Sequence, residues 1–253
     1  LALRARLGGR YHAGATLERI EADGKSVTAM RWRDAGGRER LTSCDTIGMG
    51  WHLRAETHLA DLAGCAFTYD EQWRQWLPKT DEMGRAGNGV YLAGDGVRLL
   101  GADGAEITGR LAAAACLADL GHPGRSASAD LRKLARLERF ARGLACAFPW
   151  PAGMVRALPD DAIVCRCENV TAGAVRDSAG FGGEANRVKS LSRVGMGRCQ
   201  GRYCQLAAVE LVAAAAGCAA APVGPFPGLA AGRPAAFGCV VSYWCSQTGV
   251  HPA

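Results

Sequence analysis

The sequence predicts a mixed α/β chain in two differently built parts, and three observations lead to this fold class. Short alternating apolar stretches separated by glycine turns fill residues 11–47, and leucines at helical spacing follow between 106 and 148. Beyond a proline-rich break at 149–159, four cysteines gather between 165 and 204. Of the 253 residues, 49% are hydrophobic and 21% charged, which excludes a disordered chain and allows a sizeable core.

The first part opens with strands. Apolar and polar residues alternate over 15–20, 26–32 and 41–47, with glycine turns at 24–25 and 36–37, and this predicts two hairpins feeding a further strand. A short helix is expected over 56–63. The apolar run at 89–93 predicts a compact strand that ends at Gly94-Asp95.

Two longer helices follow. Strong helix formers occupy 106–120, and Gly121 and Pro123 stop that helix. Ser128 or Asp130 can cap a second helix that runs to about Phe148. The prolines at 149, 151 and 159 then mark the main domain boundary.

The second part is small and mainly helical. We expect a short strand over 163–167, a helix capped by Thr171, a helix over about 185–192 and, after a glycine-rich loop, a last helix over 202–216. Beyond residue 221 there is a single charged residue among several prolines, so a poorly ordered tail is predicted.

Charge and cysteine content exclude several classes of protein. The 30 Lys+Arg exceed the 24 Asp+Glu, giving a net charge of +6, but they form no basic stripe of the kind that binds nucleic acid. The longest uncharged stretch, 211–232, is broken by prolines and cannot span a membrane. Eleven cysteines, an odd number in so long a chain, argue against a secreted disulfide scaffold. A reducing, cytoplasmic location is therefore expected.

Four cysteines form the strongest signal, Cys165-x-Cys167 followed by Cys199-x4-Cys204. Residues i and i+2 of a strand point to one face, so a single strand can offer two sulfurs. Glycines around Cys199 let backbone N–H groups approach sulfur, and Cys204 is expected in the first turn of a helix, whose start favours negative charge. A [2Fe–2S] cluster is the favoured interpretation; structural zinc and unrelated buried cysteines are the alternatives.

Here the chain resembles a known family. The stretches CRCENVT at 165–171 and VKSLSRVGMGRCQGRYC at 188–204 are similar to the small helical [2Fe–2S] domain of bacterioferritin-associated ferredoxin, which also occurs fused to flavoprotein dehydrogenases. The resemblance covers about sixty residues. It implies that Cys165, Cys167, Cys199 and Cys204 are the four iron ligands.

A second resemblance concerns the first part. An Asp at the end of a strand, preceded by Gly, can accept a hydrogen bond from a sugar or ribityl hydroxyl. The segments CDTIGMGW, GVYLAGDG and GAEITGRLAAAA, in that order, resemble the distal part of flavoproteins with two dinucleotide-binding domains. That resemblance implies FAD contacts from Gly94, Asp95, Ala105 and Glu106, and NAD(P) as a further cofactor. The Gly-x-Gly-x-x-Gly motifs with which such proteins begin are not found in this sequence. The stretch GFGGEA at 180–185 matches a relaxed form of the motif, but it follows a predicted helix instead of a strand and is a false match.

These observations predict four regions: the distal part of an FAD/NAD(P)-binding domain (1–125), a helical linker (126–158), the [2Fe–2S] domain (159–220) and the tail (221–253). The two resemblances together are to the FAD-containing subunit of opine oxidases, hydrogen cyanide synthase and amino-acid dehydrogenases. They imply an FAD-dependent oxidoreductase subunit that passes electrons from an amino-acid, opine or amine-type substrate through flavin to the cluster. A second flavoprotein subunit or an electron acceptor is implied as a partner, and through a partner the chain can be peripheral to the inner membrane.

No catalytic base is identified from the sequence. Two other functions stay open at this point. One is a non-enzymatic, ferredoxin-like electron carrier or interaction module attached to a truncated flavoprotein remnant that binds no flavin, whereas the enzyme subunit itself is one that can be inactive alone. The other is a zinc-stabilised binding protein.

Overall fold

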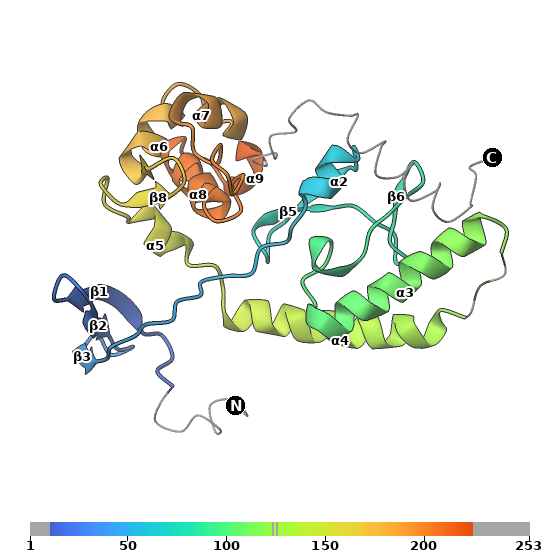
Figure 1. The fold of residues 1–253 in the computed structure, drawn as a ribbon, viewed down its shortest axis with the longest axis horizontal. Coiled ribbons are helices and arrows are strands. Elements are labelled where there is room, and N and C mark those ends of the chain that lie inside the picture. The colour runs from blue at the N-terminus through green and yellow to red at the C-terminus, as the bar shows by residue number, and fades with distance from the viewer. Residues whose placement is uncertain (1–10, 123, 125, 225–253) are drawn as a thin grey trace. The chain divides into compact units, whose positions relative to one another are not determined.

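The computed structural model describes residues 11–122, 124 and 126–224 of the chain (Figure 1). The chain divides into two compact units, Leu1–Trp51 and His52–Ala253. No helix in the described ranges is long and apolar enough to cross a lipid bilayer. Most of the predicted tail, residues 225–253, lies outside the described residues, as do Cys239 and Cys245.

The first unit is a three-stranded antiparallel sheet in the order β1 (Thr16–Ala22), β2 (Val27–Arg33) and β3 (Glu39–Ser43), which confirms the predicted hairpins (Figure 1). Trp32 is buried on β2, and its indole N–H donates to Thr42 Oγ1 at 2.9 Å. Arg31 pairs across the sheet with Glu21 and Glu39. Opposite charges on neighbouring strands favour this register.

The second unit begins with short elements. Helix α2 (His58–Leu62) precedes two hairpins, β4 (Phe67–Asp70) with β5 (Gln75–Pro78) and β6 (Arg85–Gly87) with β7 (Val90–Tyr91). The predicted strand over 89–93 is therefore shorter than expected. Asn88 and Gly89 have φ values of +51° and +70°, and such a turn closes a local hairpin. The sheets of the described residues are all small and antiparallel, so they do not form an open α/β sheet beside Gly94-Asp95.

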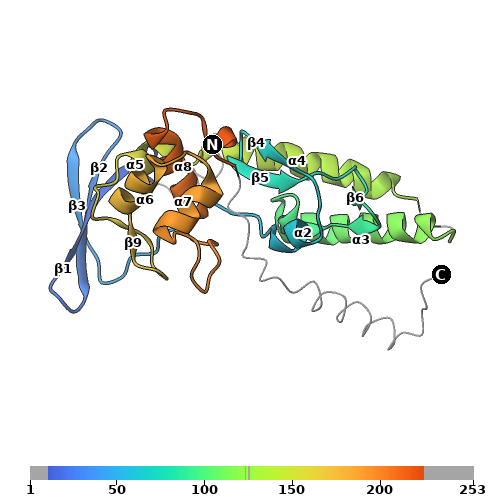
Figure 2. The ribbon, with the colours of Figure 1, turned by 90° about the horizontal axis from the view of Figure 1, so that it is seen from above.

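Two long helices, α3 (Gly101–Asp119) and α4 (Ser128–Ala147), lie side by side (Figures 1 and 2). Ile107 and Leu111 of α3 pack with Leu134 of α4 in a small apolar core. Helix α3 begins five residues before the predicted start. The expected side-chain cap of α4 is wrong, because Ala127 is its N-cap residue and Asp130 pairs with Arg110 instead.

The remaining elements form a compact helical group around one core. They are α5 (Ala152–Arg156), β8 (Ile163–Cys165), β9 (Val170–Thr171), α6 (Ala172–Ala179), α7 (Ala185–Ser192), α8 (Gln205–Ala215) and α9 (Ala220–Val223). Val175, Val188, Val194 and Leu211 are fully buried there. Thr171 caps α6 as predicted, accepting the Ala174 N–H. The helix α9 corrects the start of the predicted poorly ordered tail, because Val223 is buried in the core.

Candidate functional site

One pair of the predicted ligands lies in the interior of the helical group. Cys165 is the last residue of β8 and Cys204 is the N-cap residue of α8, so the expectation that Cys204 lies inside the first turn is corrected by one residue. The two side chains are 1% and 2% exposed. They are hydrogen-bonded to each other. Burial, followed by the nearby Cys165, raises the pKa of the Cys204 thiol to about 12.

The second pair, Cys167 and Cys199, lies closer to solvent. The strand ends at Cys165 and the chain turns, so Cys165 and Cys167 do not share one strand face as predicted; Cys165 is buried and Cys167 exposed. Cys167 instead hydrogen-bonds Cys199. The fold therefore brings two free thiols, Cys167 and Cys199, together although they are far apart in the sequence.

Backbone N–H groups surround Cys199, as its glycine-rich setting predicted. Burial opposes ionisation of Cys199, but hydrogen bonds from the Tyr203 N–H, from Cys167 and from the N–H groups of Gly201 and Arg202 lower the pKa of its thiol overall. Gln200 and Gly201 have φ values of +52° and +79°, the left-handed conformation that turns successive N–H groups inward. This environment stabilises a thiolate.

Gly197 allows the two cysteine segments to approach. A Cβ atom at this position would lie 2.2 Å from Cys167 Cβ, closer than any side chain can sit. Beside this contact, Glu168 accepts a hydrogen bond of 2.8 Å from Arg193 Nε. The glycine is therefore a steric requirement of the cysteine loop.

Among the described residues, no three or more His, Cys, Asp or Glu side chains are grouped so as to hold a metal ion. The four cysteines stand as a buried pair and a surface pair, with Cys199 close enough to influence the charge of Cys204. The chemistry of this donor set fits a two-iron cluster, in which four thiolates are divided between two irons.

Two cations flank the buried pair. Arg54, whose side chain is 13% exposed, bonds Gln205 Oε1 from Nε at 3.2 Å and from Nη2 at 2.8 Å. Lys189 on α7 is 5% exposed and also interacts electrostatically with Cys204. Burial lowers the pKa of both side chains, whereas the charge of Glu56 near Arg54 and of Asp61 near Lys189 raises it, as an ionised Cys204 would for both.

The predicted flavin contacts separate into two places. Gly94 adopts φ +75°, donates its N–H to Thr108 Oγ1 at 2.9 Å and lies against Ala105. Asp95 Oδ1 accepts the N–H groups of Leu100 and Gly101, at 3.2 and 3.1 Å, so one of its oxygens fixes the turn into α3. Gly94, Asp95 and the start of α3 are thus close together.

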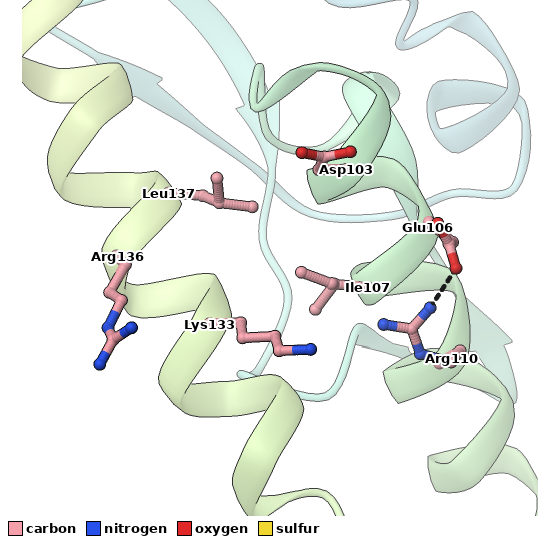
Figure 3. Close-up of a pocket in the computed structure, with 7 residues that line it drawn as sticks. All are labelled: Asp103, Glu106, Ile107, Arg110, Lys133, Arg136 and Leu137. Carbon is pink, nitrogen blue, oxygen red and sulfur yellow. Dashed lines mark hydrogen bonds and ion pairs between the residues drawn. The ribbon is translucent and has the colours of Figure 1, made fainter.

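Glu106 faces a different space. Figure 3 shows it on α3 beside a groove between α3 and α4, where its carboxylate bonds Arg110 Nη1 at 2.6 Å. The groove has a volume of about 380 Å³ and is also lined by Lys133 and Arg136 from α4. Asp103 and Glu106 line it beside these cations, so the groove contains both signs of charge, and Arg110 is also held by Asp130.

Sequence reasoning missed the buried ion pairs that attach the helical group to the preceding residues. Glu210 of α8 is 2% exposed and binds Arg74 Nε at 2.6 Å and Arg156 Nη2 at 3.0 Å. Glu210 is the only acidic residue in the otherwise apolar sequence of α8, and this could have indicated an ion pair, because a buried charge requires a partner. Nothing in the sequence pattern singled out Arg54.

The fold of this chain is similar to that of a solved structure. It resembles the structure of L-proline dehydrogenase from P. horikoshii, with a TM-score of 0.57 and 20% identity, over 87% of this chain and 44% of that chain. At this identity the likeness concerns the fold alone, a mixed α/β chain. No family model matches the sequence.

The curated relatives are more similar in sequence. An opine oxidase subunit from Rhizobium meliloti is 34% identical over 73% of this chain, and its counterpart from Agrobacterium tumefaciens (strain Ach5) is 38% identical over 71%. Hydrogen cyanide synthase subunit HcnB from Pseudomonas protegens is 26% identical over 68%. The matches cover 36%, 37% and 38% of these relatives, so the chain spans well under half of their length.

Proposed function

We propose that this chain is part of a subunit of an FAD-dependent oxidoreductase, in which Cys165, Cys167, Cys199 and Cys204 hold a [2Fe–2S] cluster. The observation that carries the proposal is the pairing of these thiols, Cys165 with Cys204 and Cys167 with Cys199. The names of the relatives, all oxidoreductase subunits, support the redox role.

The protein residues divide the work of holding such a centre. Cys165 and Cys204 would hold it against the apolar core, in which both side chains are buried. Around Cys199, the N–H groups of Gly201, Arg202 and Tyr203 offset negative charge on sulfur. When bound, the flavin exchanges two electrons and the cluster one, so the cluster would act as a one-electron relay. The exposed Cys167 side gives an acceptor the nearest approach.

On the flavin side, Gly94, Asp95 and Ala105 remain the proposed contacts. A Cβ atom at Gly94 would meet only Ala105 within 4 Å, so the backbone at Gly94 is open to close approach on its other sides. Glu106 stays a prediction, and its present partner is Arg110. The opine oxidase name supports an opine substrate, and the word subunit in both names supports a partner subunit. The amino-acid or amine-type substrate and NAD(P) rest on the sequence resemblance alone.

Two alternatives have different signatures. An electron carrier with a flavoprotein remnant would bind the cluster without flavin. A zinc-stabilised binding protein would take zinc on the same cysteines, since thiolates also bind zinc tightly.

Absorption and electron paramagnetic resonance spectra of the anaerobically purified chain test the proposal. We expect broad cluster absorbance with flavin bands, and a paramagnetic signal on reduction. Cluster absorbance without flavin would favour the carrier, and a colourless zinc-loaded protein would overturn the iron assignment.

Single substitutions test the ligands. Cys199→Ser is expected to abolish cluster absorbance, because a hydroxyl is a poor replacement for a thiolate ligand. Cys116→Ser is the matched control, since Cys116 lies on α3 outside the predicted ligand set, and it should leave the absorbance unchanged. Equal loss in the two variants would refute the assignment.

A further inference from the structure

Arg54 and Glu56 form hydrogen bonds with residues that precede and follow Cys204 in the sequence. Arg54 donates two hydrogen bonds to Gln205, the residue after Cys204. Glu56 accepts from Arg202 Nε at 2.6 Å and from Arg202 Nη2 at 3.3 Å, two residues before Cys204. Residues far apart in the sequence are thereby fixed at the start of α8.

Arg54 is the more buried member of this set. Its side chain is 13% exposed, against 45% for Arg202 and for Glu56. Its Nη2 also contacts His58 Nε2 at 3.3 Å, and its Nη1 lies 3.5 Å from Glu56 Oε2. Together these contacts hold the guanidinium in one place, within electrostatic reach of Cys204.

A fixed, poorly solvated cation has a definite effect on a neighbouring redox centre. Arginine keeps its charge throughout the ordinary pH range. Reduction adds one negative charge to an iron–sulfur centre, and a nearby positive charge stabilises that reduced form more strongly when water is excluded. Removal of the cation therefore makes reduction harder.

We propose that Arg54 is a positioning residue that holds the start of α8 and raises the reduction potential of the centre at Cys204. This inference rests on the proposed function. Lys189 on α7 also interacts electrostatically with Cys204 and adds a second positive charge that favours reduction.

The test compares reduction potentials in the full chain, measured by anaerobic spectroelectrochemical titration of the reconstituted cluster. Arg54→Gln is expected to reduce the equilibrium constant for reduction about tenfold, a potential lower by about 59 mV for one electron. Arg54→Lys keeps a charge and should recover most of this loss. Gln205→Leu keeps Arg54 but removes its acceptor, and should shift the potential in the same direction by less.

Arg74→Gln is the matched control. Arg74, like Arg54, precedes α8 in the sequence and forms a hydrogen bond with a residue of this helix. Its partner is Glu210, which lies more than one helical turn beyond Cys204. Its variant should leave the potential unchanged. An unchanged potential in Arg54→Gln, or an equal shift in Arg74→Gln, would overturn the inference while leaving the cluster assignment intact. A wild-type chain that takes up no cluster would overturn the proposed function itself.

Discussion

His58 shows how the surroundings of a single side chain fix its protonation. It is 8% exposed, and its Nε2 accepts from Arg54, which can only donate, so the neutral ring carries its proton on Nδ1. That nitrogen lies 3.3 Å from Glu56 Oε1. Burial lowers the pKa of His58; the Glu56 charge opposes this, while Arg54 and Arg202 add to it.

This lowered pKa predicts an acid-sensitive stability. The unfolded chain binds a proton at His58 near pH 6.5 and the folded chain only at lower pH, so stability falls as the pH drops below 6.5. We expect His58→Gln to flatten this dependence in urea unfolding between pH 7.5 and 5.5. Glu56 does not confuse the result, because its pKa is lowered from 4.5 and lies below the window. An unchanged slope would contradict the prediction.

At the scale of elements, helix starts explain why some predicted bounds hold and others move. Thr171 and Glu184 cap α6 and α7 with side-chain acceptors, and both helices begin where the sequence predicts. Helices α3 and α4 have no side-chain cap. For α3 the turn is fixed from outside by Asp95, and the helix extends back to Gly101.

The caps give a direct stability prediction. Thr171→Ala removes the acceptor of the Ala174 N–H at the start of a buried helix and should cost about 1 kcal/mol in the free energy of unfolding. Ser128→Ala is the control, because Ser128 begins α4 without capping it, and a change below about 0.5 kcal/mol is expected. Urea unfolding measures both, and equal losses would show that the assigned cap does not matter.

At the scale of the second unit, Glu210 joins three stretches of chain. It lies in the apolar interior of α8 and binds Arg74, which precedes β5, and Arg156 at the end of α5. Arg74 keeps a left-handed backbone, φ +52°, in this position. The two arginines are 25% and 47% exposed, so water can partly solvate them if the carboxylate is removed.

Glu210→Ala should therefore destabilise the unit by about 3 kcal/mol, the low end of the range for breaking a buried ion pair. We also expect faster proteolysis between α4 and β8, because α5 loses its anchor. Glu138→Ala removes a more exposed partner, that of Arg98, and should cost about 1 kcal/mol or less. Limited proteolysis and urea unfolding measure the difference, and equal effects would contradict the role of Glu210.

Local patterns predicted some elements of this chain but missed the short strands β4, β5 and β6 and the short helices α5 and α9. The hairpins of the first unit, helices α6 and α7 and the cap at Thr171 follow from residues close together in the sequence. The predicted strand at 89–93 is shortened because Asn88-Gly89 closes a hairpin in which only Val90–Tyr91 of that range form a strand. Contacts between distant residues, such as Arg54 with Gln205, leave no periodic signal.

For the candidate site, the sequence by itself determined which four cysteines stand out, the glycines beside Cys199 and the Gly94-Asp95 turn, because spacing and backbone freedom are local properties. Only the tertiary structure decided that Cys165 pairs with Cys204 and Cys167 with Cys199, because the chain turns after β8. It also decided that Arg54 lies against the start of α8. Burial and charge at a site depend on which distant segments pack together, and that is set by the whole fold.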